Sequence, residues 1–224
     1  FKEACDVLES AEDFDLAVHD LIKEYATEHQ RIVFNGNGYA PEWEKEARRR
    51  GLPVLPSMVD AIPALTTDKA VELFGEFGVF TKTELESRAE IQYEIYAKAI
   101  NIEAKTMVDM ATKQIIPAVI KYTTVLAESI NQVKAVGPID VSVQMDLLKK
   151  ASKLLKEVNS TMNKLSKLVD QIETHPEGRD RAVFCREKLV PAMEKLREPV
   201  DELEMLVDKD MWPMPSYGDL VFEP

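Results

Sequence analysis

The stretch DVSVQMDLLKKASKLLKEVNSTMNKLSKLVDQI, residues 140–172, carries the strongest structural signal in the sequence. Apolar residues return every seven positions, and a second apolar series follows three positions behind the first. The two series are Val141, Leu148, Leu155, Met162 and Val169, and Ala151, Val158, Leu165 and Ile172. This heptad pattern places both series along one seam of a helix. We therefore predict a long α-helix that is capped by Asp140 and packs against other helices.

The sequence after this helix predicts an antiparallel partner. THPEG, residues 174–178, breaks the helical pattern with a proline and a glycine. A second seam then alternates steps of four and three, at Leu189, Met193, Leu196, Val200, Leu203 and Val207. A short break between two seams is typical of a helical hairpin. We expect Leu155 and Leu196 to lie on its facing stripes.

A third long helix is predicted upstream. Thr81 and Glu84 have the spacing of a capping box, and no glycine then interrupts the chain before Gly137. Roughly fifty residues at about 1.5 Å each would span ~80 Å. Pro117 lies inside the pattern and should kink this helix, because proline removes a backbone donor and crowds the preceding turn.

The first part of the chain predicts shorter elements. Helices are expected from Ser10 to about His29 and from Pro41 to Gly51. Between them, RIVF (31–34) has a β-strand composition and NGNG (35–38) indicates a tight turn with positive φ. Residues 52–66 hold three prolines and form an extended connector, and a short helix follows at 67–77.

The segment MWPMPSYGDLVF, residues 211–222, predicts a docked tail. Its two prolines prevent a continuous helix, while Trp212, Tyr217 and Phe222 offer too much apolar surface to remain in water. The overall prediction is an all-α fold: a bundle of about three long helices with an antiparallel hairpin, a small N-terminal helical region and a docked irregular tail. We divide the chain into residues 1–66, 67–210 and 211–224.

Charge restricts the partners. The chain carries 28 Lys and Arg against 40 Asp and Glu, a net charge of −12. Nucleic-acid binding requires basic patches, and the basic run Arg48-Arg49-Arg50 is explained by its place at a helix end. No apolar run approaches the ~20 residues of a spanning helix. We therefore expect neither a nucleic-acid nor a membrane partner.

Gly36-Asn37-Gly38 is a candidate nucleotide loop, since it lies between a strand-like run and a helix. The third glycine of the dinucleotide motif would stand at Pro41, and no Gly-Lys-Ser/Thr follows. We favour a tight turn and assign no cofactor-binding residue.

No residues are assigned to metal binding or catalysis. The residues three before His19, His29 and His175 are not acidic, so the Glu-x-x-His pattern of di-metal bundles is missing. The sequence also contains no G-x-S-x-G nucleophile elbow.

The carboxylates Glu86, Glu90 and Glu94 form a helical stripe. We favour a solvated face over an acid–base pair, because Lys82 and Arg88 are close enough to pair with the stripe.

Other polar and sulfur-containing residues leave alternatives open. Asn101, Glu103 and Asp109 interrupt an apolar stretch and either face solvent or contact a neighbouring subunit or domain. Cys5 and Cys185 are interpreted as free thiols rather than a disulfide. The methionines at helical spacing are interpreted as core residues rather than a ligand groove: Met107, Met110, Met145, Met162 and Met193.

Three segments resemble type III glutamine synthetases, in the family's order. They are RIVFNGNGY (31–39) with the Pro-Glu-Trp helix start behind it, ESRAEIQYEIYAKAINIEAKTMVDMA (86–111) with the Pro117 region, and the tail at 211–222. The resemblance runs along nearly the whole chain and corresponds to the last third of such an enzyme. FKEACDVLE (1–9), which reads as the last turns of a helix, agrees with a truncated chain.

The resemblance implies a cytoplasmic parent that uses ATP and Mg²⁺ to ligate ammonia to glutamate in a ring-shaped homo-oligomer. The family's active-site motifs have no counterpart here, so no catalytic, cofactor-binding or metal residue is carried over. This piece is expected to be non-catalytic, to adjoin the catalytic domain through residues 1–66 and to contact neighbouring subunits. The alternative is a free-standing helical coiled-coil interaction module, favoured by the two seams and the acidic surface.

Overall fold

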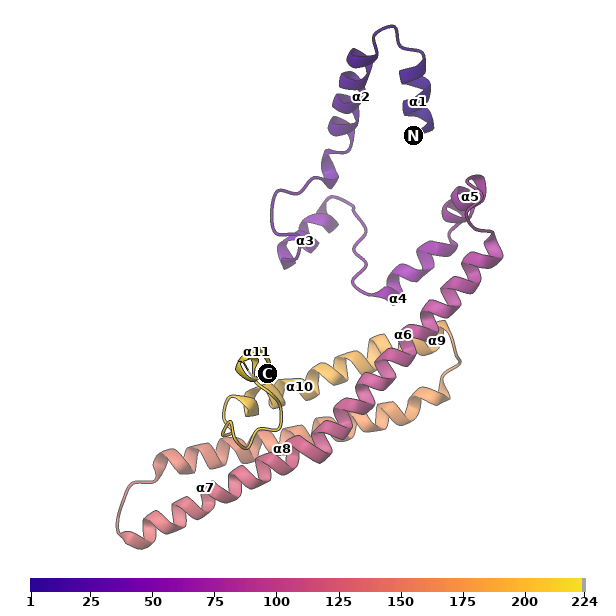
Figure 1. Ribbon diagram of the computed structural model, residues 1–224. Coiled ribbons are helices and arrows are strands. Elements are labelled where there is room, and N and C mark those ends of the chain that lie inside the picture. Colours follow the sequence, from indigo (N-terminus) through magenta and orange to yellow (C-terminus); the bar gives the residue numbers. More distant parts are fainter. Residues whose placement is uncertain (223–224) are drawn as a thin grey trace. The chain divides into compact units, whose positions relative to one another are not determined.

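The computed structural model describes residues 1–222, and every regular element in that range is helical. The all-α prediction is therefore confirmed. By its internal contacts the described chain divides into two compact units, one from Phe1 to Pro56 and one from Ser57 onward (Figure 1). The division into three parts at residues 66 and 210 stays a prediction.

The first unit contains a helical hairpin and one further helix. Asp13 begins the second arm of the hairpin, where its carboxylate accepts a hydrogen bond from the Leu16 N–H at 3.0 Å. The elements are α1 (Lys2–Glu9), α2 (Phe14–Glu28), the 3₁₀ turn η1 (Gln30–Ile32) and α3 (Pro41–Arg49).

The expected β-type run at 31–34 is wrong. Gln30–Ile32 is a 3₁₀ turn, and the extended residues behind it have no neighbouring strand in the described chain. Two carbonyl groups of the segment accept hydrogen bonds from the Arg50 side chain instead, since Arg50 Nη1 donates to the oxygens of Arg31 in the turn (3.1 Å) and of Val33 behind it (2.7 Å). Phe34 packs its ring against Trp43 of α3, with centroids 4.5 Å apart.

The turn at 35–40 forms as predicted, but not through positive φ. Asn37 holds it, because its side-chain oxygen accepts the Tyr39 N–H (3.0 Å) and its carbonyl accepts the Ala40 N–H (3.1 Å). The positive-φ glycines of the chain lie elsewhere, at Gly51, Gly78 and Gly178. Gly36 meets a steric need instead, since a Cβ there would come within 2.7 Å of the Phe34 ring.

The second unit is dominated by long helices. Its capping box at Thr81 and Glu84 forms as predicted, with the Thr81 N–H donating to Glu84 Oε2 at 2.7 Å. The elements are α4 (Met58–Ala61), η2 (Ile62–Thr66), α5 (Asp68–Glu76), α6 (Lys82–Met110), η3 (Ala111–Ile115), α7 (Ile116–Val136), α8 (Ser142–Gln171), η4 (Ile172–Thr174), α9 (Arg179–Phe184), η5 (Cys185–Leu189), α10 (Val190–Glu204) and α11 (Tyr217–Phe222).

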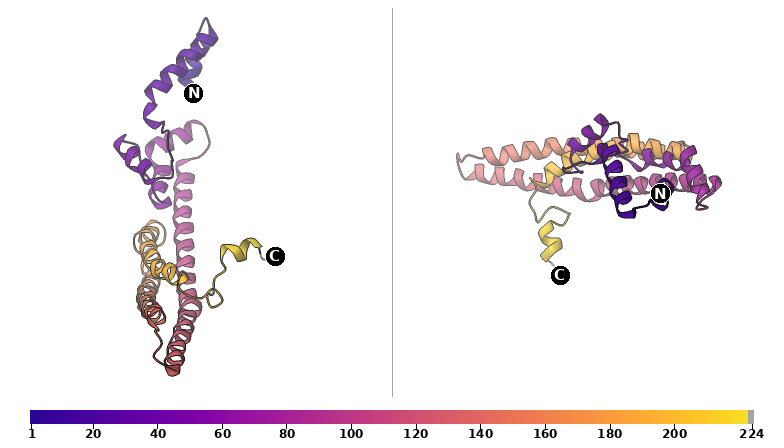
Figure 2. Two further views of the ribbon diagram at one scale, coloured as in Figure 1. Left: turned by 90° about the vertical axis from the view of Figure 1, so that its left-hand side faces the viewer. Right: turned by 90° about the horizontal axis from the view of Figure 1, so that it is seen from above.

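The long helices pack as the heptad seams predict. α8 turns back along α7 and is followed by α9 and α10, which run along α8 in the opposite direction (Figures 1 and 2). The second seam series is fully buried at Ala151, Val158 and Leu165. Leu148 and Leu155 of the first series are only partly buried, but they pack against the core. The helical hairpin is confirmed.

Both long helices that carry a proline near their middle widen before it. Pro117 follows the π-helical segment η3, and Pro191 follows the π-helical segment η5. In each case an N–H bonds five residues back, from Ile116 to Ala111 and from Val190 to Cys185. The wider turn relieves the clash between a proline ring and the carbonyl four residues before it. The disruption expected at Pro117 therefore takes the form of a π turn, and ATKQIIPA (111–118) and CREKLVPA (185–192) share the device.

Residues 57–66 belong to the second unit rather than to an open connector. Ser57 caps α4, and Arg186 of η5 binds this segment from the bundle. Its Nη2 lies 2.7 Å from Asp60 Oδ2, and its Nε donates to Ser57 Oγ at 2.9 Å.

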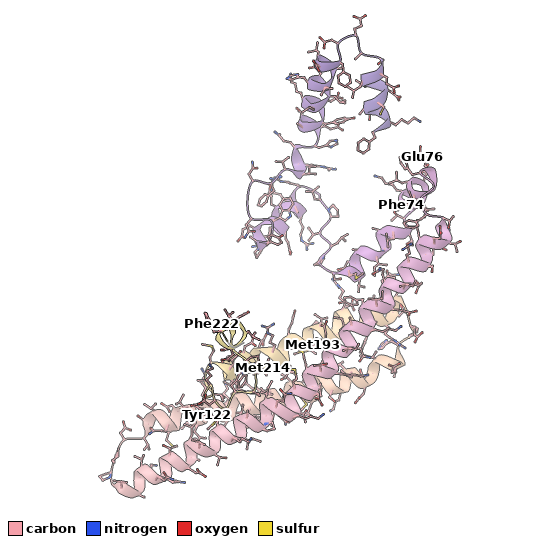
Figure 3. The ribbon with its side chains drawn as sticks, in the orientation of Figure 1. Phe74, Glu76, Tyr122, Met193, Met214 and Phe222 are labelled. Carbon is pink, nitrogen blue, oxygen red and sulfur yellow. The ribbon has the colours of Figure 1, made fainter. Side chains whose placement is uncertain are left out.

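The tail docks only through its first residues. Trp212 and Met211 pack against the bundle core, whereas Tyr217 and Phe222 are exposed within the chain, which corrects the expectation that all three aromatic rings are covered. The reason is local, because Ser216 and Asp219 start a new short helix, α11, in place of an irregular end. Figure 3 labels Met214 and Phe222 on this tail.

Candidate functional site

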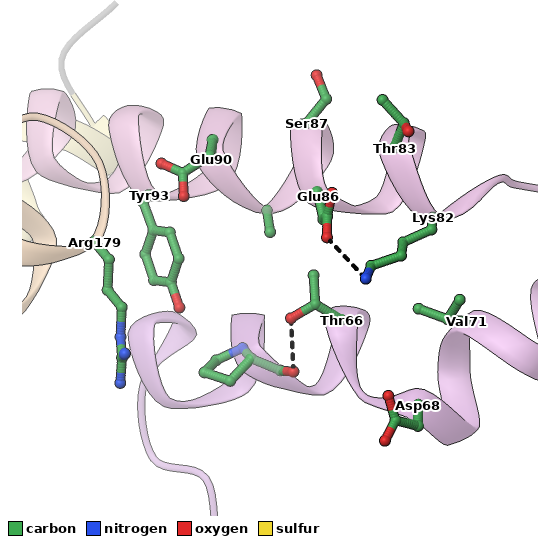
Figure 4. Close-up of a pocket in the computed structure, with 12 residues that line it drawn as sticks. Thr66, Asp68, Val71, Lys82, Thr83, Glu86, Ser87, Glu90, Tyr93 and Arg179 are labelled. Carbon is green, nitrogen blue, oxygen red and sulfur yellow. Dashed lines mark hydrogen bonds and ion pairs between the residues drawn. The ribbon is translucent and has the colours of Figure 1, made fainter.

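A polar recess of about 760 Å³ lies where η2 and α5 meet the first turns of α6 and the start of α9 (Figure 4). Helix α6 supplies one wall through residues spaced three or four apart, which share one face of a helix. We call this site the polar recess; it is lined by Pro63, Thr66, Asp68, Val71, Lys82, Thr83, Glu86, Ser87, Ala89, Glu90, Tyr93 and Arg179.

The recess holds charges of both signs. Lys82 and Glu86 pair across one helical turn, with Nζ and Oε1 3.7 Å apart. Among residues 1–222, neither Glu90 nor Arg179 forms an ion pair. The Glu90 carboxylate lies so close to Gly178 that a Cβ at that position would collide with Oε2.

Tyr93 forms the buried end of the recess, and its ring extends from α6 toward η2 beside Arg179 (Figure 4). Burial raises the pKa of the Tyr93 hydroxyl; the positive charge of Arg179 lowers this pKa and the negative charge of Glu90 raises it. The phenol is therefore protonated at neutral pH and can donate a hydrogen bond. The recess can bind a polar molecule through charge pairing and this hydroxyl.

The carboxylate stripe divides between solvent and the recess. Glu86 and Glu94 pair with lysines four residues away, Glu94 with Lys98 at 3.0 Å. The interpretation of these two as a solvated face is confirmed. The expected pairing of Arg88 with the stripe is wrong, because its guanidinium lies over the Phe80 ring, 4.3 Å from the centroid.

Asn101 differs from the two other polar residues of its stretch. Asp109 pairs with Lys113 on the surface and Glu103 is exposed. The Asn101 side-chain oxygen is buried, and no group in the described part of the chain donates to it. An unpaired buried oxygen of this kind costs free energy unless a partner is supplied.

The histidines lie apart, as separate residues near helix ends or on the surface. His19 lies 3.3 Å from Asp20, and the His175 ring stacks on Phe184 with centroids 4.0 Å apart. Within residues 1–222 no group of three or more His, Cys, Asp or Glu side chains could hold a metal ion. In the same range, no helix combines the length and apolar character needed to cross a membrane.

A second site, which we call the methionine groove, was not predicted. Met107 and Met110 face α10 across a groove of about 430 Å³ instead of being fully covered. Of the five methionines expected in the core, Met162 is buried, and Met107 and Met193 are partly buried and pack against the core. The helical spacing of these methionines is the same in a buried core and in the wall of a groove. The sequence therefore contains no signal that distinguishes the two structures. The groove is lined by Met107, Met110, Ala111, Ile115, Leu196, Arg197, Val200, Asp201, Glu204 and Met214.

The cysteines are free thiols, as predicted. Cys5 is exposed, and Cys185 is buried in η5 with its sulfur 3.9 Å from the carbonyl oxygen of Ala97 on α6. Burial raises the pKa of the Cys185 thiol, so this residue is an inert packing group at neutral pH.

Comparison with known proteins identifies the family of this architecture. Residues 17–134 match the model of the glutamine synthetase C-terminal domain. The chain is 33% identical over 214 residues, 95% of its length, to a glutamine synthetase of Butyrivibrio fibrisolvens. It is 32% identical over 92% of its length to the type-3 glutamine synthetase of Dictyostelium discoideum, and 30% identical over 99% to a glutamine synthetase of Bacteroides fragilis.

These matches cover only part of each relative. The chain spans 31% of the Butyrivibrio protein, 29% of the Dictyostelium protein and 31% of the Bacteroides protein. It therefore corresponds to about a third of the length of the relatives it matches.

Proposed function

This chain belongs to the glutamine synthetase C-terminal domain family, and from that premise we propose that it is the structural and assembly part of a type III glutamine synthetase. The whole protein would ligate ammonia to glutamate with ATP and Mg²⁺, as the names of the relatives and the family resemblance imply. The chain itself would support the catalytic part and contact neighbouring subunits of a ring-shaped homo-oligomer.

The observation that carries this proposal is the uncovered apolar surface of the first unit. In the described structure neither α1 nor α2 has a buried residue. Phe14, Leu16 and Ile22 of α2 each expose more than half of their surface. These exposed apolar side chains lie on more than one face of α2, and apolar surface of this extent normally packs against another element. We infer that α2 packs against the part of the enzyme that this chain does not include.

The second unit supports a scaffold role in a different way. Its core is one continuous cluster that joins residues of α6, α7, α8, α9 and α10, from Ala89 to Val207. Such a continuous bundle can hold distant surfaces at fixed positions, because closely packed interiors deform little.

The described residues do not fit a site for ATP and Mg²⁺. Carboxylates are the ligands Mg²⁺ prefers, yet no group of three or more Asp, Glu, His or Cys side chains within residues 1–222 is arranged so that it could hold a metal ion. The NGNG turn also leads into a helix whose first turn carries Glu42 and Glu44, which repel phosphate. We therefore assign no step of the ligase reaction to this chain.

The test is a set of substitutions in the full-length enzyme. Replacing Phe14, Leu16 and Ile22 together by Ser should reduce both assembly into the large oligomer and glutamine synthesis. The matched control replaces the exposed polar residues Asp20, Lys23 and Glu24 by Ser and should leave both unchanged. Full assembly and activity of the apolar triple variant would contradict the proposal.

A further inference from the structure

Glu90 and Arg179 bring opposite charges to one end of the polar recess without neutralising each other. The Glu90 carboxylate lies against Gly178, the residue before Arg179, so closely that a Cβ there would collide with it. Within residues 1–222, neither Glu90 nor Arg179 forms an ion pair or a side-chain hydrogen bond. Both side chains are exposed, so a molecule that enters the recess can reach both charges.

Tyr93 supplies a third polar group at the same end of the recess, beside Arg179 (Figure 4). The residue is only 4% exposed, yet no group in the described part of the chain forms a hydrogen bond with its hydroxyl. The hydroxyl is not among the fully enclosed unpaired atoms of that part, so it remains open to the recess. A buried tyrosine hydroxyl normally has a hydrogen-bond partner, and leaving it without one costs free energy. The recess therefore lacks a partner for this group.

The charges that line the recess restrict the ligand. Asp68, Glu86 and Glu90 are acidic, Lys82 and Arg179 are basic, and Lys82 pairs with Glu86 at 3.7 Å. The carboxylates would repel a simple anion, and the two basic side chains would repel a simple cation. A molecule that carries both a carboxylate and an ammonium group can satisfy Glu90 and Arg179 together.

We propose that the polar recess binds a free α-amino acid in its zwitterionic form. The carboxylate of the ligand accepts hydrogen bonds from the Arg179 guanidinium and the Tyr93 hydroxyl, and its ammonium group donates to Glu90. A guanidinium presents parallel donors that match a carboxylate. The recess measures about 760 Å³ and continues along α6 past the hydroxyls of Ser87 and Thr83, so it has room for a polar side chain. This site goes beyond the proposed assembly role.

Titration of the isotope-labelled 224-residue chain with L-serine tests the site. We expect saturable changes in the amide chemical shifts of Gly178 and Arg179. Two matched probes each lack one charge: ethanolamine is L-serine without its carboxylate, and β-hydroxypropionate is L-serine without its ammonium group. Each should bind about tenfold more weakly or worse, because it loses a charge-assisted contact. A response to L-serine that does not saturate, or equal affinity for a probe with one charge, would overturn the proposal.

Substitutions locate the binding. Arg179→Gln and Glu90→Gln should each raise the dissociation constant for L-serine about tenfold or more. Tyr93→Phe removes only the hydroxyl and should raise this constant about threefold to tenfold, with thermal unfolding unchanged because the hydroxyl has no partner in the described chain. The matched control is Glu94→Gln, one turn further along α6 and outside the recess, where Glu94 pairs with Lys98. This variant should keep the affinity of the unmodified chain.

Unchanged affinity in both charge variants would show that L-serine binds elsewhere and would overturn the assigned site. None of these measurements involves α2, so their failure leaves the test of the proposed function standing.

Discussion

Lys150 of α8 and Glu202 of α10 face each other, with Nζ 3.9 Å from Oε2, and so mark the antiparallel register in which the two helices of the hairpin pack. Moving inward from this pair along both helices brings Leu155 and Leu196 to about the same level, as the two seams predicted. Leu196 is 1% exposed, whereas Leu155 is half-buried beside the fully covered Leu154. The two leucines therefore contribute unequally.

Truncation along this hairpin should follow burial. Leu196→Ala should lower the free energy of unfolding by about 2–5 kcal/mol, as for other buried leucines, and Leu155→Ala should cost less. The exposed Lys153, whose ion pair with Glu157 spans 3.7 Å, should cost under about 0.5 kcal/mol when changed to Ala. Denaturant unfolding measures all three. A larger loss for Lys153→Ala than for Leu196→Ala would show that the register is wrong.

Gly178 should not tolerate a side chain. Its φ of +82° and ψ of −136° suit glycine, and an added Cβ would also collide with Glu90 Oε2. Gly178→Ala should therefore cost roughly 1–3 kcal/mol, the range for such backbone strain. Adding Glu90→Ala should recover only the steric part of the loss.

Gly75→Ala is the matched control for this substitution. Gly75 lies within α5, and a Cβ there would meet open space, so alanine should stabilise the chain by roughly 0.5–1 kcal/mol. Equal effects of the two alanine substitutions in thermal unfolding would contradict the assigned backbone constraint.

Much of this fold could be predicted because the deciding signals are local. The heptad seam at Ala151, Val158 and Leu165 is a spacing that any helix must bury, and the box at Thr81 starts α6 within one turn. The segment at 31–34 could not be predicted, because its backbone partner is Arg50, whose side chain replaces a strand ladder. Residue composition alone does not reveal that a side chain takes the hydrogen-bonding place of a neighbouring strand.

The two sites were missed for a similar reason. The polar recess joins Glu90 with Arg179, and the methionine groove joins Met107 with Val200, so both depend on which helices meet. From the sequence, Glu90 cannot be distinguished from the other members of a solvated stripe. Only the structure shows that the turn at Gly178 lies against its carboxylate. The position of α11 likewise depends on a contact that the sequence does not reveal, the hydrogen bond from Lys209 to Asp219.

Arg50 should be irreplaceable by lysine. Its guanidinium donates to two backbone carbonyls and, through Nε, to Glu46 at 2.6 Å. Lysine has a single point of donation and cannot reproduce this fork. Arg50→Lys should therefore speed amide hydrogen exchange at Tyr39 and Ala40, whereas Arg49→Lys, which removes only contacts to Glu46, should not. Equal exchange rates in the two variants would show that the hydrogen bonds from Arg50 do not hold this segment in place.

The start of α11 should loosen in acid. Lys209, with further hydrogen bonds from Ser216, lowers the pKa of Asp219 to about 2. Because this pKa lies below that of the unfolded chain, about 3.9, the stabilisation is fully present above that value and is lost as pH falls toward about 2. The chemical shift of the Ser216 amide should report this transition, and Asp219→Asn should abolish it. A Ser216 shift that is flat from pH 5 to 2 in the unmodified chain would contradict the assignment.

The isolated 224-residue chain should neither bind ATP nor make glutamine. One reason is that no group of three or more Asp, Glu, His or Cys side chains in its described part could hold a metal ion such as Mg²⁺. The other is that the NGNG turn is followed by a helix whose first turn carries acidic side chains, which repel phosphate. Calorimetry with ATP and Mg²⁺ should show no heat of binding, with the full-length enzyme as the positive control. Micromolar binding, or any turnover, would place part of the ligase site in this chain.

Two truncations should separate the parts of the tail. Removing residues 211–224 deletes Trp212, which packs on the bundle core, and should lower the melting temperature by several degrees. A loss of 1 kcal/mol is expected to shift Tm by about 2–4 °C in a domain of this size. Removing only residues 216–224 keeps Trp212 and takes away α11, whose apolar side chains are mostly exposed within the same chain. This shorter deletion should leave the melt of the dilute monomer unchanged while weakening self-association. If both truncated chains kept the melt and the hydrodynamic size of the intact one, neither the anchor at Trp212 nor the exposed helix would serve the fold or its assembly.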